Sequence, residues 1–407
     1  MANYKTPGVY VKEASRVPPS VEEVATAVPA FIGHTQKAGR VTDNDLRLVP
    51  TRIRSLTEYE QYFGTTDSVD FTIHLVQDSV SGDWRLQPIA LPAVTFRLYD
   101  CMKHFFANGG AACYVVSVGD LDEPVVLGDD DSGLQGGLKQ LEKEDEPTLI
   151  VIPEAVRLGA STQFFGLMNT VLGQCRTLMD RFAIMDLYDQ DVTLFRNAIS
   201  SDLEYVQYGA AYHPWLKTAL NYSYDDNTVT IGTHLNENGD DVVDGLAGSS
   251  IGADAVKGRN RALYNQINAE LQKLYVVLPP SAAVAGVYSR VDGSRGVWKA
   301  PANVSLHKVI EPLVTITNEI QEGLNVDRVA GKSINAIRTF SGRGTLVWGA
   351  RTLAGNDNEW RYVSVRRFFN MVEESVKKST RWAVFEPNNA STWVKVKSLI
   401  ENYLMQK

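Results

Sequence analysis

Three acidic residues, Glu154, Asp186 and Asp189, stand at the ends of apolar runs in this 407-residue chain. Such runs are typical of buried strands, and active sites in α/β folds usually form where strands end. A pair of carboxylates placed there could provide the general acid and the general base of a hydrolase. The sequence around these residues has no nucleophile elbow, no His-Glu-x-x-His motif and no companion histidine. We therefore expect charged loop ends, and a carboxylate-dependent hydrolase with an α/β core is the alternative function.

A second motif, Gly331-Lys332-Ser333, imitates the end of a phosphate-binding loop. The full motif needs a glycine five residues before Gly331, and that position is Val326. The segment also lacks the buried strand that should precede such a loop. We expect no nucleotide cofactor, so the energy for any movement must come from folding and contacts.

Two acidic loops, 128–133 and 236–241, contain the oxygen ligands that calcium prefers. Neither loop has the alternating spacing closed by a glutamate that an EF-hand requires. The three cysteines, Cys101, Cys113 and Cys175, have no Cys-x-x-Cys spacing and lie in segments patterned as helices or strands. We expect solvated turns, buried thiols and no metal ion.

The net charge and its distribution limit the classes of molecule that the chain is expected to bind. The formal net charge is −8, which disfavours nucleic acid because a phosphate-binding surface needs a basic excess. Residues 290–407 carry 18 lysines and arginines against 11 aspartates and glutamates, which suits a surface facing an acidic partner. The chain lacks the roughly 18 consecutive apolar residues of a membrane helix, so we expect no direct membrane insertion and assembly in the cytoplasm.

The segments that must position these side chains alternate between strand and helix patterns. The predicted strands are 27–32, 112–118, 149–152, 182–187 and 205–208, and the predicted helices are 95–106 and 161–179. Ser161 is the expected N-cap of the second helix. This alternation is typical of a mostly parallel, doubly wound α/β sheet. Residues 36–95 fit the alternation less cleanly, and we expect peripheral helices and loops there.

The first 26 residues contain one short strand pattern, in which Val9 and Val11 alternate with Tyr10 and Lys12. A single strand is unstable alone, so this segment must pair with the edge of another sheet. That sheet belongs either to the same subunit or to a neighbouring one. Pro18-Pro19 prevents the strand from continuing directly into the core.

An amphipathic helix is predicted over residues 365–381. Its apolar stripe consists of Val365, Phe368, Phe369, Val372 and Val376. Arg366, Asn370, Glu373 and Lys377 lie on the opposite face. We expect the stripe to pack on a sheet, while Lys377, Lys378 and Arg381 face a partner.

Several motifs occur in a fixed order along the chain: Thr6–Glu13, Ala27–Gly33, Leu278–Gly286, Arg295–Asn303, Val347–Leu353, Tyr362–Arg367 and Val384–Asn389. In these motifs and their order the chain resembles contractile tail sheath proteins. Sheaths of this kind occur in contractile phage tails, R-type bacteriocins and extracellular contractile injection systems.

The resemblance implies three parts. These are an N-terminal arm strand in residues 1–26, an outer α/β domain in residues 27–285, and an α+β C-terminal sheath domain next to an inner tube in residues 286–407. Five tryptophans are assigned mainly to the core of the third part: Trp298, Trp348, Trp360, Trp382 and Trp393. The family's C-terminal arm is expected to be short or missing, because the chain ends at Lys407.

The resemblance also implies a function without catalysis. The chain is expected to be a structural subunit of a helical sheath, in stacked hexameric rings, that contracts to drive an inner tube through a target envelope. Its expected partners are other copies of itself, the inner tube protein, baseplate and terminal cap proteins, and sheath paralogues. The intersubunit arm would be Pro7-Gly8-Val9-Tyr10-Val11-Lys12, and the tube-facing helix would present Lys377, Lys378 and Arg381. The sheath would be part of a phage tail or of a tail-like particle released outside the cell. A binding module that does not polymerise is the remaining alternative.

Overall fold

The computed structural model of this chain describes residues 21–78, 80–92, 95–242 and 245–407. The predicted arm strand Pro7–Lys12 lies outside these residues. The chain divides into a large unit, Ala25–Asn370, and a small unit in which residues up to Val24 join Met371–Lys407.

The centre of the large unit is a nine-stranded sheet. Its strands are, in order, β12 (Val304–Ser305), β15 (Gly344–Val347), β14 (Ile334–Phe340), β8 (Gly209–His213), β7 (Phe182–Asp186), β6 (Leu149–Val151), β1 (Pro29–Thr35), β5 (Cys113–Asp120) and β2 (Thr51–Ile53). Neighbouring strands from β14 to β5 are parallel, whereas β2 at one edge and β15 and β12 at the other are antiparallel. Every residue of β1, β6, β7 and β8 is buried, as expected for parallel strands covered on both faces.

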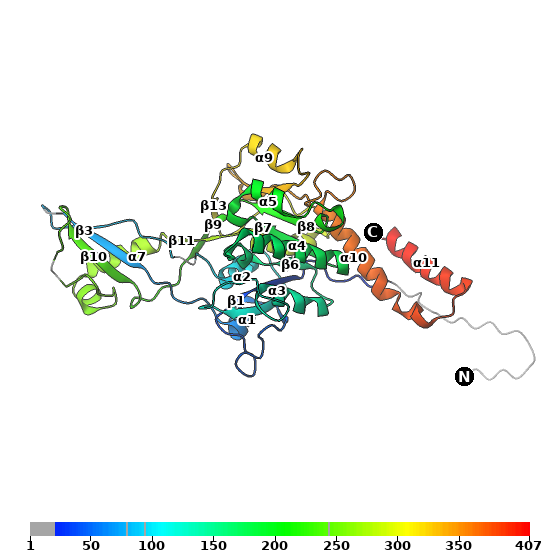
Figure 1. Ribbon diagram of the computed structural model, residues 1–407, viewed down its shortest axis with the longest axis horizontal. Coiled ribbons are helices and arrows are strands. Elements are labelled where there is room, and N and C mark those ends of the chain that lie inside the picture. The colour runs from blue at the N-terminus through cyan, green and yellow to red at the C-terminus, as the bar shows by residue number, and fades with distance from the viewer. Residues whose placement is uncertain (1–20, 79, 93–94, 243–244) are drawn as a thin grey trace, which may run out of the picture. The chain divides into compact units, whose positions relative to one another are not determined.

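Helices cover both faces of this sheet (Figure 1). Helices α2 (Leu98–Ala107) and α8 (Ser281–Arg295) pack on each other, and the Phe105 ring of α2 lies 5.0 Å from the Phe31 ring of β1. Consecutive strand residues point to opposite faces. Ile32 accordingly meets α3 (Gly133–Gln140), where a Cβ added to Gly137 would lie 2.6 Å from Ile32 Cγ2. Helix α4 (Ser161–Leu178) packs against α3 and β7. The predicted mixed α/β class is confirmed.

Shorter elements complete the large unit. They are α1 (Leu56–Phe63), η1 (Leu141–Lys143), η2 (Pro153–Arg157), η3 (Tyr188–Gln190), α5 (Val192–Ala198), α6 (Leu203–Val206) and α9 (Asn318–Asn325). A three-stranded sheet orders β11 (Tyr275–Leu278), β9 (Leu216–Asn221) and β13 (Val309–Pro312).

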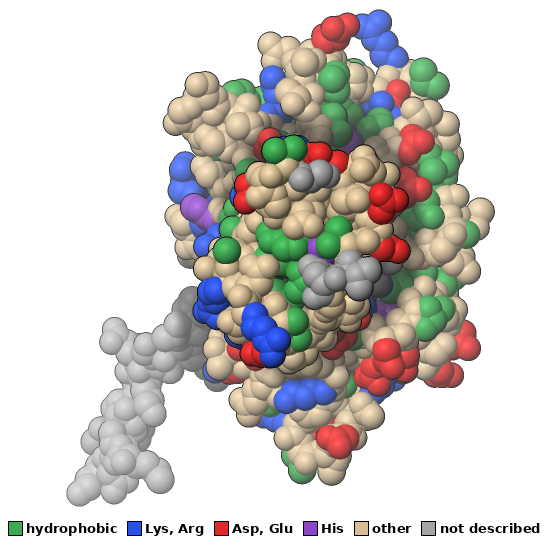
Figure 2. All heavy atoms as spheres, turned by 90° about the vertical axis from the view of Figure 1, so that its left-hand side faces the viewer, with side chains coloured by type: hydrophobic (Ala, Val, Ile, Leu, Met, Phe, Trp, Pro, Cys, Tyr) green, Lys and Arg blue, Asp and Glu red, His purple; other side chains and the backbone are tan. Residues whose placement is uncertain are grey.

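A small lobe of the large unit has its own three-stranded sheet. It contains β10 (Thr230–Asn236), β3 (Thr72–Gln77), β4 (Trp84–Leu86), α7 (Arg261–Leu271) and the π-helical turn η4 (Asp254–Gly258). This lobe lies at the left of Figure 1. Figure 2 views that side, where acidic and basic side chains mix with polar ones and hydrophobic side chains occur in small groups. Such a surface is typical of one that faces solvent.

Three details of the predicted elements were wrong. Residues 36–95, expected to form peripheral helices and loops, also contribute β2 to the central sheet and β3 and β4 to the small lobe. Tyr205–Tyr208 is not a strand, because α6 and a turn occupy it and β8 begins only at Gly209. The Asp202 side chain accepts a hydrogen bond from Glu204 N at 3.0 Å, which favours a helical turn there. Helix α4 begins at Ser161, and its N-cap residue is Ala160 rather than Ser161. The apolar face predicted for α4, which runs from Phe164 to Cys175, is buried as expected.

The sequence-based boundary between residues 285 and 286 falls inside α8. Strand β14, beyond that boundary, pairs with β8 in the central sheet. The compact large unit therefore extends through both of the predicted domains as far as Asn370. The division into an outer part and a tube-facing part stays a prediction about the assembled protein.

Helix α10 (Val363–Ser379) begins in the large unit and ends in the small one. The small unit continues with η5 (Arg381–Phe385) and α11 (Ala390–Met405). Helix α11 is capped by Asn389, whose side chain accepts from Thr392 N at 3.1 Å, and it buries Leu399 and Tyr403. Within the described ranges, no helix is long and apolar enough to cross a membrane.

Candidate functional site: helix α10 and the C-terminal hairpin

Helix α10 is the predicted working surface, and its burial follows the predicted pattern only in part. In the large unit its buried residues are Val363, Arg366, Arg367 and Asn370, whereas Phe369 of the apolar stripe is 41% exposed. The remaining stripe residues, Val365, Phe368, Val372 and Val376, are only partly buried. Three polar side chains therefore face the protein interior in the first half of the helix, whereas Glu373 and Lys377 of the predicted polar face are exposed as expected.

A buried ion pair holds the first half of α10 to α8. The guanidinium of Arg367 makes two contacts with Asp292, Nη1 to Oδ1 at 3.0 Å and Nη2 to Oδ2 at 2.5 Å. The same guanidinium lies 4.7 Å from the ring centre of Tyr288, whose hydroxyl is 2.7 Å from that of Tyr212. Two parallel contacts and an aromatic face satisfy a charge that would otherwise be costly to bury.

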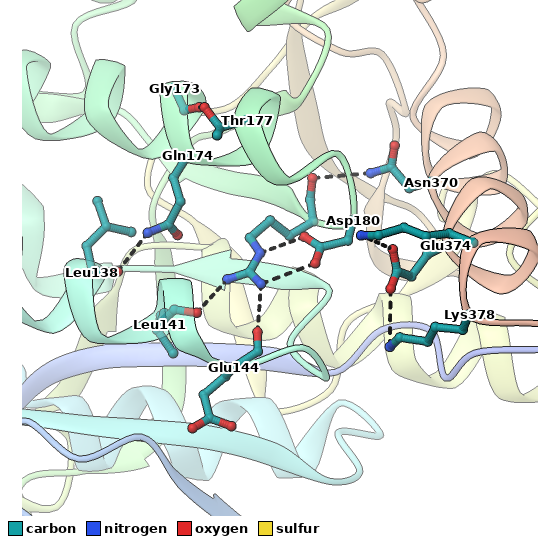
Figure 3. A network of polar contacts seen from close by, with 12 residues as sticks. Leu138, Leu141, Glu144, Gly173, Gln174, Thr177, Asp180, Asn370, Glu374 and Lys378 are labelled. Carbon is teal, nitrogen blue, oxygen red and sulfur yellow. Dashed lines mark hydrogen bonds and ion pairs between the residues drawn. The ribbon is translucent and has the colours of Figure 1, made fainter. Parts of the chain in front are cut away.

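A second set of polar contacts joins α10 to the end of β7. Arg366 Nε donates to Asn370 Oδ1 at 2.7 Å, and Asn370 Nδ2 donates to the carbonyl of Arg181 at 3.2 Å. The Arg366 guanidinium also lies 4.2 Å from the ring centre of Trp360. Asn370 is thus fixed at both ends of its amide, as Figure 3 shows for its contact with the main chain.

Arg181 itself is a fully buried side chain. Its guanidinium donates to the carbonyls of Leu141 at 2.9 Å and Glu144 at 2.8 Å, and its Nε lies 2.7 Å from Asp180 Oδ1 (Figure 3). Leu141 opens η1 and Glu144 is the residue that follows it, and the Leu141 carbonyl also accepts from Glu144 N at 3.2 Å. The Arg181 side chain therefore binds two carbonyls at η1, while its own carbonyl accepts a hydrogen bond from Asn370 of α10.

The three basic residues predicted to face a tube lie at the far end of α10, in the small unit. Lys377 Nζ is 3.0 Å from Glu374 Oε2, and Lys378 Nζ is 3.4 Å from Glu374 Oε1. Arg381 opens η5 and is exposed. The structure brings the three together at one helix end. Their contact with a tube stays a prediction.

The hairpin of η5 and α11 exposes large apolar side chains. Phe385 is 99% exposed and Trp393 is 61% exposed, and Val384, Val394, Leu404 and Met405 are also exposed. A groove of about 680 Å³ in this hairpin is lined in part by Val384, Pro387, Trp393, Val396 and Ile400. Monomeric soluble proteins rarely leave this much contiguous apolar surface uncovered, so the hairpin has the character of an interaction surface.

The tryptophans of the C-terminal part were expected in the core, and only some of them are buried or partly buried. Trp360 is half-buried, and its ring centre lies 5.2 Å from that of Phe369. Trp348 packs against Phe340, with ring centres 4.5 Å apart. For Trp298, which is 55% exposed, and for Trp393 the expectation was wrong.

Glu154 is buried rather than a charged loop end. One of its oxygens accepts from His34 N at 2.8 Å and lies 2.9 Å from His34 Nδ1, and the other accepts from Leu98 N at 3.2 Å. The expectation that no histidine accompanies this carboxylate was therefore wrong. A Cβ added to Gly33 would lie 2.9 Å from Glu154 Oε2, so the space around the carboxylate is filled.

Asp186 is also buried, and it caps a helix. It accepts from Ser281 N at 2.8 Å and from Ser281 Oγ at 2.5 Å, at the first turn of α8. Burial raises the pKa of Asp186 to about 7, although both hydrogen bonds act to lower it. Among the described residues no hydrogen bond or ion pair joins Asp186 to Glu154, while Asp189 is exposed in η3. The arrangement of these carboxylates is that of caps inside a core.

Lys332 of the imitation phosphate loop points inward. Its Nζ donates to the carbonyls of Arg196 and Ile199, both at 2.6 Å, at the end of α5. Burial lowers the pKa of this amine. An amine used in this way closes a helix end.

The polar interior of α10 was missed by sequence reasoning. Arg181 lies 189 residues from Asn370, and Asp292 lies 75 residues from Arg367. One signal was available: Arg366, Arg367, Asn370 and Ser375 recur on one helical face, which an apolar-stripe argument assigns to solvent.

The chain is similar to known proteins both in its C-terminal residues and, in solved structures, over almost its full length. Residues 355–407 match the family model of the phage tail sheath C-terminal domain. The tail sheath protein of Enterobacteria phage T4 is 25% identical over 150 residues, which is 37% of this chain and 22% of that protein. The chain thus spans less than a quarter of the length of this curated relative.

Solved sheath structures match almost the full chain. The helical sheath of the anti-feeding prophage in its contracted state is 27% identical, with a TM-score of 0.60, over 99% of this chain and 83% of that one. The sheath complex of PVC, an extracellular contractile injection system, in its contracted state is 27% identical, with a TM-score of 0.58, over 100% of this chain and 82% of that one. The chain is a homologue of the contractile tail sheath proteins of phages and of contractile injection systems.

Proposed function

We propose that the chain is a structural subunit of a contractile helical sheath that surrounds an inner tube and contracts to drive it through a target envelope. The observation that carries the proposal is the exposed apolar surface of the η5–α11 hairpin, which lies within the residues that match the sheath C-terminal domain. A surface of this kind is stable when other subunits cover it.

The proposal gives each part of the chain a role. Residues 1–26 form the arm, and its strand Pro7–Lys12 adds to a sheet of a neighbouring subunit. Residues 27–285 form the outer, doubly wound domain, and residues 286–407 form the sheath domain next to the tube. The strand order, in which β1 lies between β5 and β6, supports the doubly wound assignment. The placement of Lys377, Lys378 and Arg381 at one helix end supports a tube contact through that end.

The partners follow from these roles. The subunit assembles with copies of itself in stacked hexameric rings and contacts an inner tube protein, a baseplate, terminal cap proteins and sheath paralogues. It is assembled in the cytoplasm as part of a phage tail or tail-like particle, and it catalyses no reaction.

Contraction draws its energy from packing in this proposal. Subunits assemble around the tube in an extended lattice and pass, on a signal from the baseplate, to a shorter and wider lattice that buries more surface between subunits. Strand exchange through the arm keeps neighbouring subunits linked by main-chain hydrogen bonds while their bodies move. The two buried carboxylates no longer support the hydrolase alternative, because both are engaged in capping contacts inside the core.

Negative-stain electron microscopy tests this proposal. The purified full-length chain is compared with a variant that lacks residues 1–25. We expect tubes or rings from the full chain alone and a folded, unassembled protein from the variant. Monodisperse monomers from both, even after an inner tube protein is added, would contradict the sheath function and favour a binding module.

A further inference from the structure

Residues 21–24 lie along the last two turns of α10 and are attached there by two serines. Val24 N donates to Ser375 Oγ at 3.1 Å, and Glu22 N donates to Ser379 Oγ at 3.1 Å. Between these contacts, Glu23 forms an ion pair with Lys407. All of these residues belong to the small unit.

The distance between the two main-chain donors matches the distance between the two serine hydroxyls. Alternate residues of an extended chain lie about 6.6 Å apart, and residues four apart on a helix lie about 6 Å apart along its axis. Two hydroxyls on consecutive turns can therefore accept from two alternate main-chain N–H groups of one extended segment. We call this pair of serines, Ser375 and Ser379, the serine clasp.

The hydrogen bond that the Ser375 hydroxyl donates fixes its orientation, so that its oxygen can accept from Val24 N. Its hydroxyl donates to the carbonyl of Met371 at 2.6 Å, which leaves its lone pairs to receive the Val24 N–H. Ser375 is fully buried, so water does not readily replace the hydroxyl as the partner of that N–H. Removing the hydroxyl would leave a main-chain donor without its partner, which is the costly way to lose a hydrogen bond.

The direction in which residues 21–24 run along α10 determines which end of the helix they approach. From Val24 back to Glu22 the chain passes from Ser375 to Ser379, that is, toward the end of α10 that carries Lys377, Lys378 and Arg381. Glu22 is therefore attached at the same helix end as those three basic residues.

We propose that Ser375 and Ser379 are positioning residues that fix the start of the N-terminal arm to α10, so that a pull on the arm is transmitted directly to the basic end of this helix. The inference rests on the proposed sheath function for the role of the arm. In an assembled sheath the clasp would link two contacts of one subunit, one with a neighbouring subunit through the arm and one with the tube through α10.

Residue-resolved amide hydrogen exchange of the full-length chain tests the clasp itself. In the double variant S375A/S379A we expect the Glu22 and Val24 amides to exchange on the order of tenfold faster, because each loses its acceptor. The control is S201A, which removes an exposed serine hydroxyl from the large unit. S379T retains a hydroxyl and should keep the protection of Glu22. Unchanged exchange in the double variant would overturn the clasp.

Electron microscopy of the same proteins tests the coupling. We expect S375A/S379A to keep its circular dichroism spectrum and to form shorter or fewer tubes than the wild type and S201A. Faster exchange combined with wild-type assembly and contraction would overturn the positioning role and leave the sheath function intact. If even the wild type fails to assemble, the sheath function is contradicted, while the exchange experiment still decides whether the clasp exists. If the double variant does not fold, S379A replaces it, because Ser379 is only partly buried.

Discussion

Arg367 on α10 and Asp292 on α8 form a two-contact ion pair in which both side chains are only 4% exposed. Together with the contacts of Arg366 and Asn370, this pair holds the first half of α10 in the large unit. Replacing only one partner leaves a buried charge without its counterion, which typically costs about 3–5 kcal/mol.

We therefore expect Arg367→Met to lower the free energy of unfolding by about that amount. Joint replacement of both partners, Arg367→Met with Asp292→Leu, should recover much of the loss, because no lone charge remains buried. Denaturant unfolding of the single and double variants measures both effects. Equal losses in the two variants would mean that the packing of the aliphatic stem, and not the charge, is what matters.

The stability of the protein should depend on the ionisation of Asp186. Burial raises its pKa from 3.8 to about 7 in the folded protein, so the folded state binds a proton more tightly than the unfolded state does. The contribution of this group to stability is therefore fully present below pH 3.8 and is lost as the pH rises through about 7.

Asp186→Asn should remove that dependence while it keeps an oxygen for Ser281. Denaturant unfolding at about pH 5 and about pH 7.5 should show the wild type losing stability relative to the variant as the pH rises. Asp189→Asn is the matched control, because Asp189 is exposed in η3. A difference between wild type and Asp186→Asn that is the same at both pH values would contradict the raised pKa.

The apolar surface of the hairpin should be required for assembly and dispensable for folding. We expect Phe385→Ser combined with Trp393→Ser to leave the melting temperature of the subunit nearly unchanged, because both side chains are exposed. The same variant should form few or no tubes, because large aromatic side chains supply most of the binding energy of an interface.

Val41→Ser is the control for that experiment. Val41 is as exposed as the hairpin residues but lies in a loop of the large unit. Electron microscopy and thermal melting are compared for the three proteins. Normal tubes from the hairpin variant would exclude this surface from the subunit interface.

The basic end of α10 should contribute to tube binding in a salt-dependent way. We expect neutralisation by Lys377→Gln, Lys378→Gln and Arg381→Gln to weaken co-sedimentation with inner tubes at low salt and to flatten its salt dependence. A variant with Lys139→Gln and Lys143→Gln, which neutralises two exposed residues of the large unit, is the control. Equal weakening by both variants would indicate a general effect of charge rather than a contact through α10.

The central sheet could be read from the sequence because its strands are buried on both faces. β1, β5, β6 and β7 appear in the sequence as continuous apolar runs, and such runs need no knowledge of partners far along the chain. The buried face of α4 was equally accessible, because its apolar residues repeat with the period of a helix.

The orientation of α10 could not be predicted in this way. An apolar stripe is assumed to face the interior, but here Asp292 and the carbonyl of Arg181 satisfy a polar face, and both lie far away in sequence. His34 and Glu154 illustrate the same limit, because 120 residues separate the two side chains that meet in the core. The sequence could indicate which residues on α10 are unusual, but not which side of the helix is covered.

Glu154 lies in η2, just after β6, and contacts His34 near the carboxyl end of β1. Two main-chain amides and an imidazole hold the carboxylate there permanently. The carboxylate thus links three elements, because His34 belongs to β1, Leu98 opens α2 and Glu154 itself lies in η2. Any motion that keeps these contacts must carry the strand, the helix and the turn together as one body.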